Sequence, residues 1–204
     1  VTAVATSGFV DVTVKYGGLT ASARVLVWSG TAPAVVATTQ LGGAPYAAAV
    51  SPTGAYYVSD GSGGGFYRGD LPGHDLSTHT ATGGSMRSVA FDSGGVRAFI
   101  ATLASGSVAV VDVATNQVVD SITIPKGIGA PLSVAVTPDG SKLLVGCDAA
   151  LLMYDANTYA LLDSTSGSEV YHFAFHPSLP RVYATSSGSQ VREIDLNTFS
   201  VLRT

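Results

Sequence analysis

Two pairs of histidines are close enough in the sequence to be compared with metal sites. His172 and His176 are four residues apart, the spacing that places two ligands together on one face of a helix. The residues around them instead favour a strand, on which these two positions lie about 13 Å apart. His74 and His79 flank Asp75 in an expected loop and would bind a metal ion only adventitiously. We therefore predict no metal site.

Two other features resemble reactive motifs. The glycine-rich run 61–65 could cradle a phosphate, but such a loop needs Lys and Ser or Thr after its last glycine, and then a helix. Phe66 and Tyr67 follow instead and continue as a strand, so the run is typical of a hairpin tip. Cys147, the only cysteine, ends an apolar run and has no neighbouring His or Lys to lower its pKa. We expect a buried, unreactive thiol.

Three aspartates recur at the same point of a repeated segment. Asp112, Asp155 and Asp195 each end an apolar run, and a turn follows each of them. Asp at the start of a turn accepts hydrogen bonds from backbone N–H groups, and Asn tolerates the left-handed conformation that a tight turn needs. A catalytic residue has no reason to recur in this way. We therefore predict no catalytic residues here and structural turn roles for Asp112, Asp155, Asp195, Asn157 and Asn197.

The elements that carry these residues recur with a period of about forty positions between Pro45 and Thr204. Each copy reads as an apolar strand, a turn rich in Pro, Asp or Gly, a second strand, a third strand that ends in aspartate, and a fourth strand. The ends of the first strands stand in register at Val50, Phe91, Val136 and Phe175. Four antiparallel strands per repeat of this length are typical of β-propeller blades. We predict an all-β propeller with about four blades, near residues 45–84, 85–129, 130–170 and 171–204.

The repeats also resemble a known family. Residues 108–119 (VAVVDVATNQVV) and 132–145 (LSVAVTPDGSKLLV), with their imperfect copies, are similar to the YVTN-type β-propeller repeats of bacterial and archaeal cell-surface proteins. The resemblance extends over the segment 35–204 and implies a propeller at the cell surface. WD-repeat propellers are the nearest rival, but a Trp-Asp pair is absent, Gly-His does not recur from repeat to repeat, and Trp28 lies outside the repeats.

The N-terminal segment 1–28 has a different pattern. Apolar and polar residues alternate over 10–16 and 21–27, on either side of Gly17-Gly18, which predicts a β-hairpin with one apolar face. This segment resembles the closing strands of a bacterial Ig-like domain of the group 2 type. Residues 29–34 read as a linker that is stiffened by Pro33, and residues 35–41 as a single strand before the propeller.

The small number of blades leaves three alternatives open. The chain is a fragment with further blades, or a closed ring of four in which strand 35–41 completes the blade that begins at Tyr171, or a ring completed by a second chain. The sequence does not begin with methionine and contains no signal peptide, so we expect a piece of a larger surface protein. An open propeller would also expose sheet edges, through which self-association could occur.

Loops around one end of a propeller channel commonly bind ligands. The charged residues in loops that could face this channel mouth are Asp60, Asp148 and either Arg68 or Arg87, but no nucleophile or base accompanies them at a recognisable spacing. Aromatic residues gather in the first repeat. We expect them to be core residues or cross-strand pairs, with a contact patch as the alternative: Tyr46, Tyr56, Tyr57, Phe66 and Tyr67.

Composition restricts the partners. Charged residues make up only 12% of the chain, the net charge is −4 and no Lys/Arg run occurs, which argues against nucleic acid as a partner. No apolar stretch approaches the roughly 20 residues that span a bilayer. We predict an extracellular or cell-surface, non-catalytic module for binding, adhesion or surface structure, with a protein or surface glycan as ligand and no cofactor. The alternatives are a lactonase-like or quinoprotein-like propeller enzyme, and a structural subunit of a surface assembly or filament.

Overall fold

The chain divides into two compact units, residues 1–38 and 39–204, in this computed structural model. The structure describes residues 8–16, 19–27, 41–62, 64–70, 78–82 and 84–204. The predicted linker 29–34, the predicted strand 35–41 apart from Leu41, and the pair His74 and Asp75 lie outside these residues.

The first unit contains a two-stranded antiparallel hairpin. Strand β1 (Gly8–Tyr16) pairs with β2 (Leu19–Val27), and the register runs from Gly8 opposite Val27 to Tyr16 opposite Leu19. The alternation of apolar and polar residues in this segment predicts such a hairpin, because successive side chains of a strand point to opposite faces.

The second unit consists of four antiparallel sheets of four strands each, and the strands of each sheet are neighbours in chain order. We number these sheets as blades 1 to 4. Blade 1 is β3 (Pro45–Val50), β4 (Ala55–Asp60), β5 (Gly65–Asp70) and β6 (Thr78–Ala81). Blade 2 is β7 (Met86–Phe91), β8 (Arg97–Thr102), β9 (Ser107–Asp112) and β10 (Gln117–Thr123). Blade 3 is β11 (Pro131–Val136), β12 (Lys142–Cys147), β13 (Ala150–Asp155) and β14 (Leu161–Ser166). Blade 4 is β15 (Val170–Phe175), β16 (Arg181–Ser186), β17 (Gln190–Asp195) and β18 (Val201–Arg203).

Every regular element in the described residues is a strand, which confirms the all-β prediction. Within that part of the chain no helix has the length and apolar character needed to cross a bilayer. Blade 4 takes its fourth strand from β18, so it does not need the predicted strand 35–41 to complete its sheet.

Tight turns join the first and second strands of each blade. In blades 1 to 3 the turn contains a glycine with positive φ, at Gly54, Gly95 and Gly140. Blade 4 has no glycine in this turn, which reads His176-Pro177-Ser178-Leu179-Pro180. Its backbone is held by the His176 ring, whose Nδ1 accepts hydrogen bonds from the backbone N–H groups of Ser178 and Leu179 at 3.2 and 3.0 Å. A side-chain acceptor therefore stabilises a turn that elsewhere depends on glycine.

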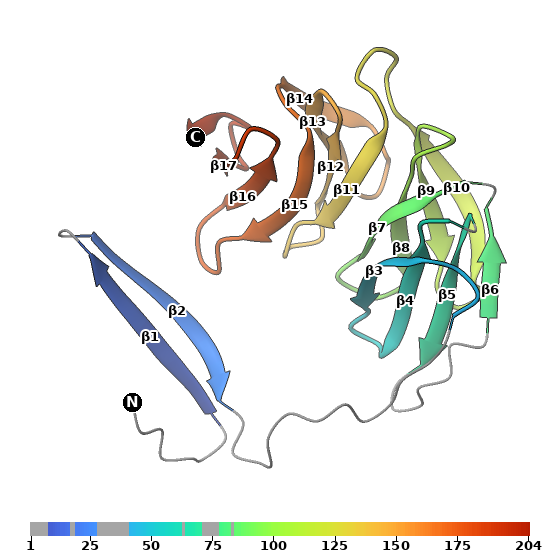
Figure 1. Cartoon of the computed structure of the whole chain (residues 1–204), viewed down its shortest axis with the longest axis horizontal. Coiled ribbons are helices and arrows are strands. Elements are labelled where there is room, and N and C mark those ends of the chain that lie inside the picture. The colour runs from blue at the N-terminus through green and yellow to red at the C-terminus, as the bar shows by residue number, and fades with distance from the viewer. Residues whose placement is uncertain (1–7, 17–18, 28–40, 63, 71–77, 83) are drawn as a thin grey trace. The chain divides into compact units, whose positions relative to one another are not determined.

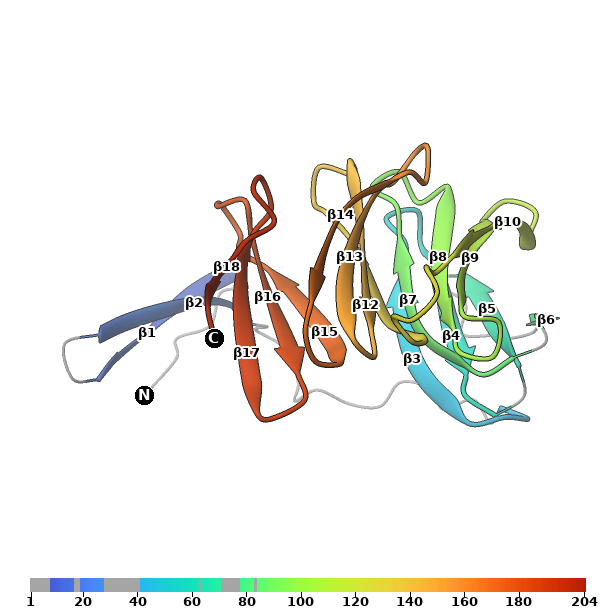
Figure 2. The same cartoon turned by 90° about the horizontal axis from the view of Figure 1, so that it is seen from above.

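The cores lie between successive blades. One apolar cluster joins blades 1 and 2, a second joins blades 2 and 3, and a third joins blades 3 and 4. The innermost strands also touch in series, β3 with β7, β7 with β11 and β11 with β15. Figure 1 shows the four blades in chain order, from blade 1 at one end of the series to blade 4 at the other, and Figure 2 shows the same blades turned by 90°. Blades 2 and 3 bury both of their faces, whereas blades 1 and 4 each bury one.

Candidate functional site

The inner strands of all four blades surround a small cavity. We call the end of the blades at which β3, β7, β11 and β15 begin the proximal end, and the other the distal end. The proximal cavity has a volume of about 80 Å³ and takes residues from every blade: Tyr46, Ala47, Arg87, Ser88, Leu132, Tyr171 and His172. These residues occupy the second and third positions of their strands. Because the inner strands all begin at the proximal end, these positions lie close together. We call this cavity the axial pocket.

Arg87 is the cation of the axial pocket. Its guanidinium carbon lies 4.4 Å from the centre of the Tyr46 ring, within the range of a cation–π contact. In the described part of the chain, Arg87 Nε is buried but has no hydrogen-bond partner. A partly buried arginine with an unused Nε–H donor is suited to an anionic group, because charge-assisted hydrogen bonds are the stronger kind.

Tyr171 forms another part of the wall. Its hydroxyl donates a 2.5 Å hydrogen bond to Glu169 Oε2, and this bond raises the pKa of Tyr171 above its ordinary value. The phenol therefore stays protonated at neutral pH and is suited to hydrogen bonding rather than to proton abstraction. Together with Tyr46 and the Arg87 cation it makes a surface for stacking and for binding anions.

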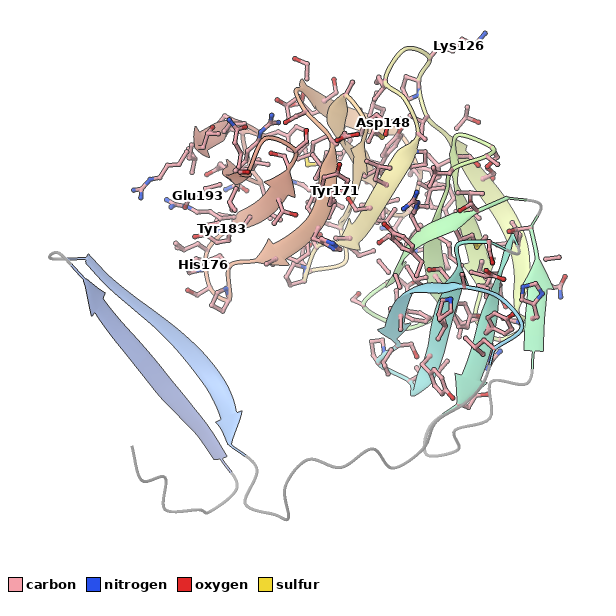
Figure 3. The ribbon with its side chains drawn as sticks, viewed as in Figure 1. Lys126, Asp148, Tyr171, His176, Tyr183 and Glu193 are labelled. Carbon is pink, nitrogen blue, oxygen red and sulfur yellow. The ribbon has the colours of Figure 1, made fainter. Side chains whose placement is uncertain are left out.

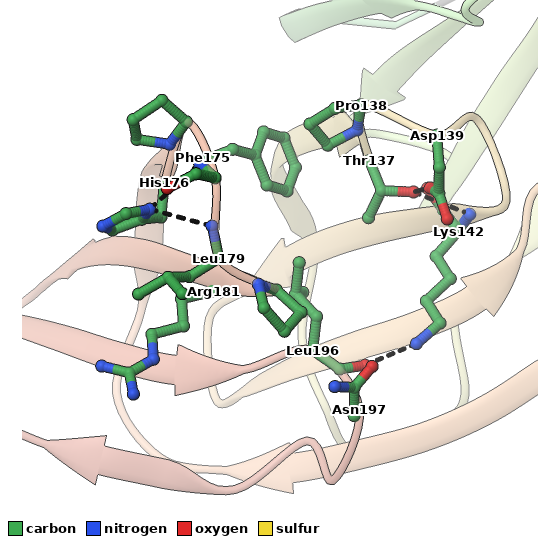
Figure 4. Close-up of a pocket in the computed structure, with 13 residues that line it drawn as sticks. Thr137, Pro138, Asp139, Lys142, Phe175, His176, Leu179, Arg181, Leu196 and Asn197 are labelled. Atoms are coloured by element: carbon green, nitrogen blue, oxygen red, sulfur yellow. Dashed lines mark hydrogen bonds between the residues drawn. The ribbon is translucent and has the colours of Figure 1, made fainter.

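A larger cavity lies at the distal end, between blades 3 and 4 (Figure 4). Its volume is about 300 Å³, and its walls include Pro138, Pro177 and Pro180. Its polar groups already serve the turns. Lys142 Nζ donates to the carbonyl of Leu196, and Asp139 accepts hydrogen bonds from Thr137 Oγ1 at 2.5 Å and from the Ser141 backbone at 3.1 Å. We regard the axial pocket as the better candidate, because it holds an unused donor and residues from all four blades.

The turn aspartates lie at the distal end of the third strands, away from the axial pocket. Asp112 accepts from Thr115 N at 2.7 Å, Asp155 from Thr158 N at 2.8 Å, and Asp195 from Thr198 N at 3.0 Å. These backbone hydrogen bonds lower the pKa of all three carboxyl groups. Asn157 and Asn197 contribute only their backbone N–H groups to the same carboxylates, each within 2.9 Å.

In these turns the residue with a left-handed backbone is neither Asn157 nor Asn197. It falls four residues after each aspartate, at Asn116 with φ 59°, Tyr159 with φ 60° and Phe199 with φ 52°. Only blade 2 has an asparagine there. Assigning that conformation to Asn157 and Asn197 from residue preference is therefore wrong, because packing places an aromatic residue at this position in blades 3 and 4.

Of the four charged residues predicted near the channel mouth, only Arg87 lines the axial pocket. Asp60 is buried and accepts from Ala44 N at 3.1 Å and from Ser62 N at 2.8 Å, so it anchors the start of β3. Asp148 accepts from Ala130 N at 2.7 Å in the same way before β11. Arg68 lies on β5 and donates to the Val113 carbonyl at 2.5 Å, which joins blade 1 to blade 2.

The structure separates the predicted histidine pair along β15. His172 lines the axial pocket, while His176 lies at the distal end of the same strand in the turn described above (Figure 3 labels Tyr171 and His176). His79 lies on β6, with its Nε2 3.8 Å from Asp60 Oδ2. Among the described residues no group of three or more His, Cys, Asp or Glu could hold a metal ion.

Three further features from the sequence analysis lie in the propeller unit. The described residues of the glycine run join β4 to β5 as a hairpin tip, with Gly64 at φ 72°. Cys147 is fully buried at the end of β12, and desolvation raises the pKa of its thiol to about 12. In the aromatic group, Tyr57 and Phe66 are buried and stacked with ring centres 4.9 Å apart, whereas Tyr46 is exposed.

Comparison with known proteins identifies the fold but no family. No protein-family model matches the sequence, and no curated protein matches it. Among solved structures, the hydrazine synthase of Kuenenia stuttgartiensis matches with a TM-score of 0.71 and 22% sequence identity. The match covers 85% of this chain and 52% of that one, so the chain spans about half the length of its structural neighbour.

The fold is a β-propeller. Four antiparallel sheets of four strands, joined by apolar clusters and aligned by their inner strands, have the architecture of successive propeller blades. At 22% identity the likeness to the synthase extends to the fold alone. What the propeller of this chain binds must be argued from its own residues.

Proposed function

We propose that this propeller is a non-catalytic binding module of the cell surface whose axial pocket takes a carboxylate group of a surface glycan or of a protein ligand. The observation that carries the proposal is Arg87, with its buried, unpartnered Nε and its guanidinium stacked on Tyr46 at the meeting point of four inner strands. A volume of about 80 Å³ suits one functional group rather than a whole small molecule.

The alternative of a propeller enzyme is less well supported. The raised pKa of Tyr171 disfavours its use as a base, and its hydroxyl is engaged with Glu169. His172 lines the pocket, but no hydroxyl or thiol nucleophile bonded to it is found among the described lining residues. Binding needs only the cation and the aromatic surfaces that these residues provide.

The surface location belongs to the same proposal. It is supported by the resemblance of segments 108–119 and 132–145 to YVTN-type repeats, and by the hairpin β1–β2, which we propose to be the last strands of an Ig-like domain. A binding propeller beside an Ig-like domain would suit an adhesin or a surface layer.

A binding assay tests this function. It compares oligosaccharides that contain uronic acids with neutral oligosaccharides and with glutamate-rich peptides. We expect binding to require the carboxylate and to weaken about tenfold or more in Arg87→Gln, because a charge-assisted hydrogen bond is lost. Arg203→Gln is the matched control, since Arg203 is highly exposed and lies outside the pocket. Equal affinity of the Arg87→Gln variant, or equal loss in both variants, would contradict the proposal.

A further inference from the structure

At two successive junctions between blades, a cation of one blade reaches across to the next blade at the distal end. Arg97 and Lys142 are the first residues of β8 and β12. Arg97 donates to the carbonyl of Ala156 at 3.1 Å, and Lys142 donates to the carbonyl of Leu196. Both acceptors directly follow the aspartate that ends a third strand. The two junctions are therefore equivalent, and their other groups can be compared position by position.

At the junction of blades 2 and 3 the chain itself supplies the partners of the cation. The Arg97 guanidinium forms an ion pair with the Asp92 carboxylate, with the two groups 3.1 Å apart. It also donates to the Tyr159 hydroxyl at 3.1 Å and to Asn157 Oδ1 at 2.9 Å. A charge that is partly removed from water is stable when an opposite charge and hydrogen-bond acceptors accompany it. The positive charge at this junction is therefore neutralised within the chain.

The junction of blades 3 and 4 has different groups at the same positions. Thr137 replaces Asp92, because each directly follows an innermost strand and donates its backbone N–H to the carbonyl of the cation at 2.9 Å. Phe199 replaces Tyr159, with the same left-handed backbone but without a hydroxyl. Among the described residues, no carboxylate forms an ion pair with Lys142. This junction therefore keeps the cation but not the acid.

The other charged groups beside Lys142 have partners of their own. Asp139 accepts from Thr137 Oγ1 at 2.5 Å and from Ser141 Oγ at 2.7 Å, so its carboxylate is engaged within its own turn. Arg181 forms an ion pair with Glu193 at 2.5 Å. A lysine ammonium has three N–H donors, and the carbonyl of Leu196 accepts from one of them. The ammonium therefore retains both an unanswered charge and donors for a further acceptor.

This ammonium belongs to the lining of the distal cavity of about 300 Å³, a volume at the lower end of the range for small-molecule sites. Figure 4 shows the Lys142 side chain extending towards Leu196 and Asn197. The side-chain amide of Asn197 is a further hydrogen-bonding group of the lining. Phe175 and Leu179 supply apolar wall. The cavity thus combines a cation, an amide and an apolar surface.

We propose that the distal cavity is a second binding site, which takes a small carboxylate with an apolar body. The ligand carboxylate supplies the negative charge that Asp92 supplies at the equivalent junction, and it accepts hydrogen bonds from the Lys142 ammonium. Such charge-assisted hydrogen bonds are the stronger kind. The apolar body packs against Phe175 and Leu179. Both walls of the site belong to blades 3 and 4, and the site is independent of the axial pocket.

Binding of phenylacetate to the full chain, measured by calorimetry and by ligand-detected NMR, tests the proposal. Phenylacetamide is the comparison ligand, because it has the same shape but no charge. We expect the wild-type chain to bind phenylacetate at least about tenfold more tightly than phenylacetamide, and Lys142→Gln to abolish this preference. Lys126→Gln is the matched control, since Lys126 is exposed and lies outside the cavity (Figure 3).

A second variant leaves Lys142 in place. Leu179→Glu adds a negative charge to the cavity wall and should weaken phenylacetate binding about tenfold by repulsion. Leu202→Glu is its control, because both leucines are 44% exposed and only Leu179 lines the cavity. Exposed side chains can be replaced without removing core packing, and circular dichroism checks that all four variants are folded.

Several results would overturn the proposal. They are an absence of phenylacetate binding, equal affinity of the wild-type chain for the two ligands, or an unchanged preference in Lys142→Gln. Binding that is lost in Arg87→Gln rather than in Lys142→Gln would place the carboxylate in the axial pocket instead. Tighter binding of an unstructured peptide that ends in phenylalanine would overturn the assignment to a small molecule.

Discussion

Arg97 on β8 donates a 3.1 Å hydrogen bond to the hydroxyl of Tyr159, which follows the third strand of the next blade. Tyr159 adopts a left-handed backbone with φ 60°, a conformation that costs an ordinary residue about 1–2 kcal/mol. Its ring stands edge-on to Phe99 with the ring centres 6.2 Å apart. A contact between two blades therefore offsets a locally unfavourable backbone.

The first prediction concerns this junction. Arg97 also bonds Ala156 O at 3.1 Å and Asn157 Oδ1 at 2.9 Å, and it pairs with Asp92 at 3.1 Å. Arg97→Met should keep much of the packing but lower the free energy of unfolding by about 2–3 kcal/mol, because several partners are lost together. Tyr159→Phe removes one acceptor and should cost about 1 kcal/mol or less. Chemical denaturation measures both, and equal losses in the two variants would contradict the ranking.

The second prediction concerns acid. The hydrogen bonds from Thr115, Thr158 and Thr198 lower the pKa of Asp112, Asp155 and Asp195 in the folded state. A lowered folded-state pKa stabilises the protein above the unfolded pKa of about 3.9, and this stabilisation is lost as the pH falls through the folded value. Stability should therefore decline below about pH 4.

Asn replacements test this origin. Asp155→Asn and Asp195→Asn should each make the free energy of unfolding less dependent on pH in the acid range. Asp163→Asn is a suitable control, because Asp163 lies in β14 and accepts only from the adjacent Ser164 N–H among the bonds described for it. Denaturation at a series of pH values measures the slopes. An unchanged slope in both turn variants would exclude the turn aspartates as its source.

The third prediction concerns Cys147. Burial raises the pKa of its thiol to about 12, so the reactive thiolate is scarce at neutral pH and the sulfur is inaccessible. An alkylating reagent should label the native protein very slowly and the denatured protein rapidly. Because there is a single cysteine, mass spectrometry gives an unambiguous readout. Rapid labelling under native conditions would show that the core between blades 2 and 3 opens readily.

The fourth prediction concerns two glycines that are required for different reasons. A Cβ on Gly146 would contact Ser133 Oγ and lie 2.6 Å from the Val170 carbonyl, at a place where β11, β12 and β15 meet. Gly146→Ala should therefore cost about 1–3 kcal/mol by overpacking. Gly106 has φ 59° but open space around it, so Gly106→Ala should cost about 1–2 kcal/mol through its backbone alone.

The two mechanisms are separable. Gly106→Asn should be tolerated better than Gly106→Ala, because asparagine adopts the left-handed conformation more readily. Gly146→Asn should be worse than Gly146→Ala, because the added atoms have no space. Thermal denaturation of the four variants compares them, and the same order at both positions would contradict the assignment.

The internal repeat was sufficient to predict an all-β chain of four-stranded blades, because period-two alternation is a local property. Local properties also misled. Residue preference pointed to Asn157 and Asn197 for the left-handed position, but Tyr159 and Phe199 occupy it because their rings are held by other blades. Similarly, Arg68 and Arg87 are equivalent as charges in a sequence, and only the order of strands within a blade places one at a junction and the other at the axis.

The sequence by itself determined that Tyr56 and Tyr57 point to opposite faces of one strand, since alternation is a property of the extended backbone. The tertiary structure alone decided that Tyr57 is fully buried against blade 2 while Tyr56, on the opposite face of the same strand, is only partly buried. The reason is physical. Burial is a relation between sheets that are distant in the chain, and no local pattern records which neighbour is present.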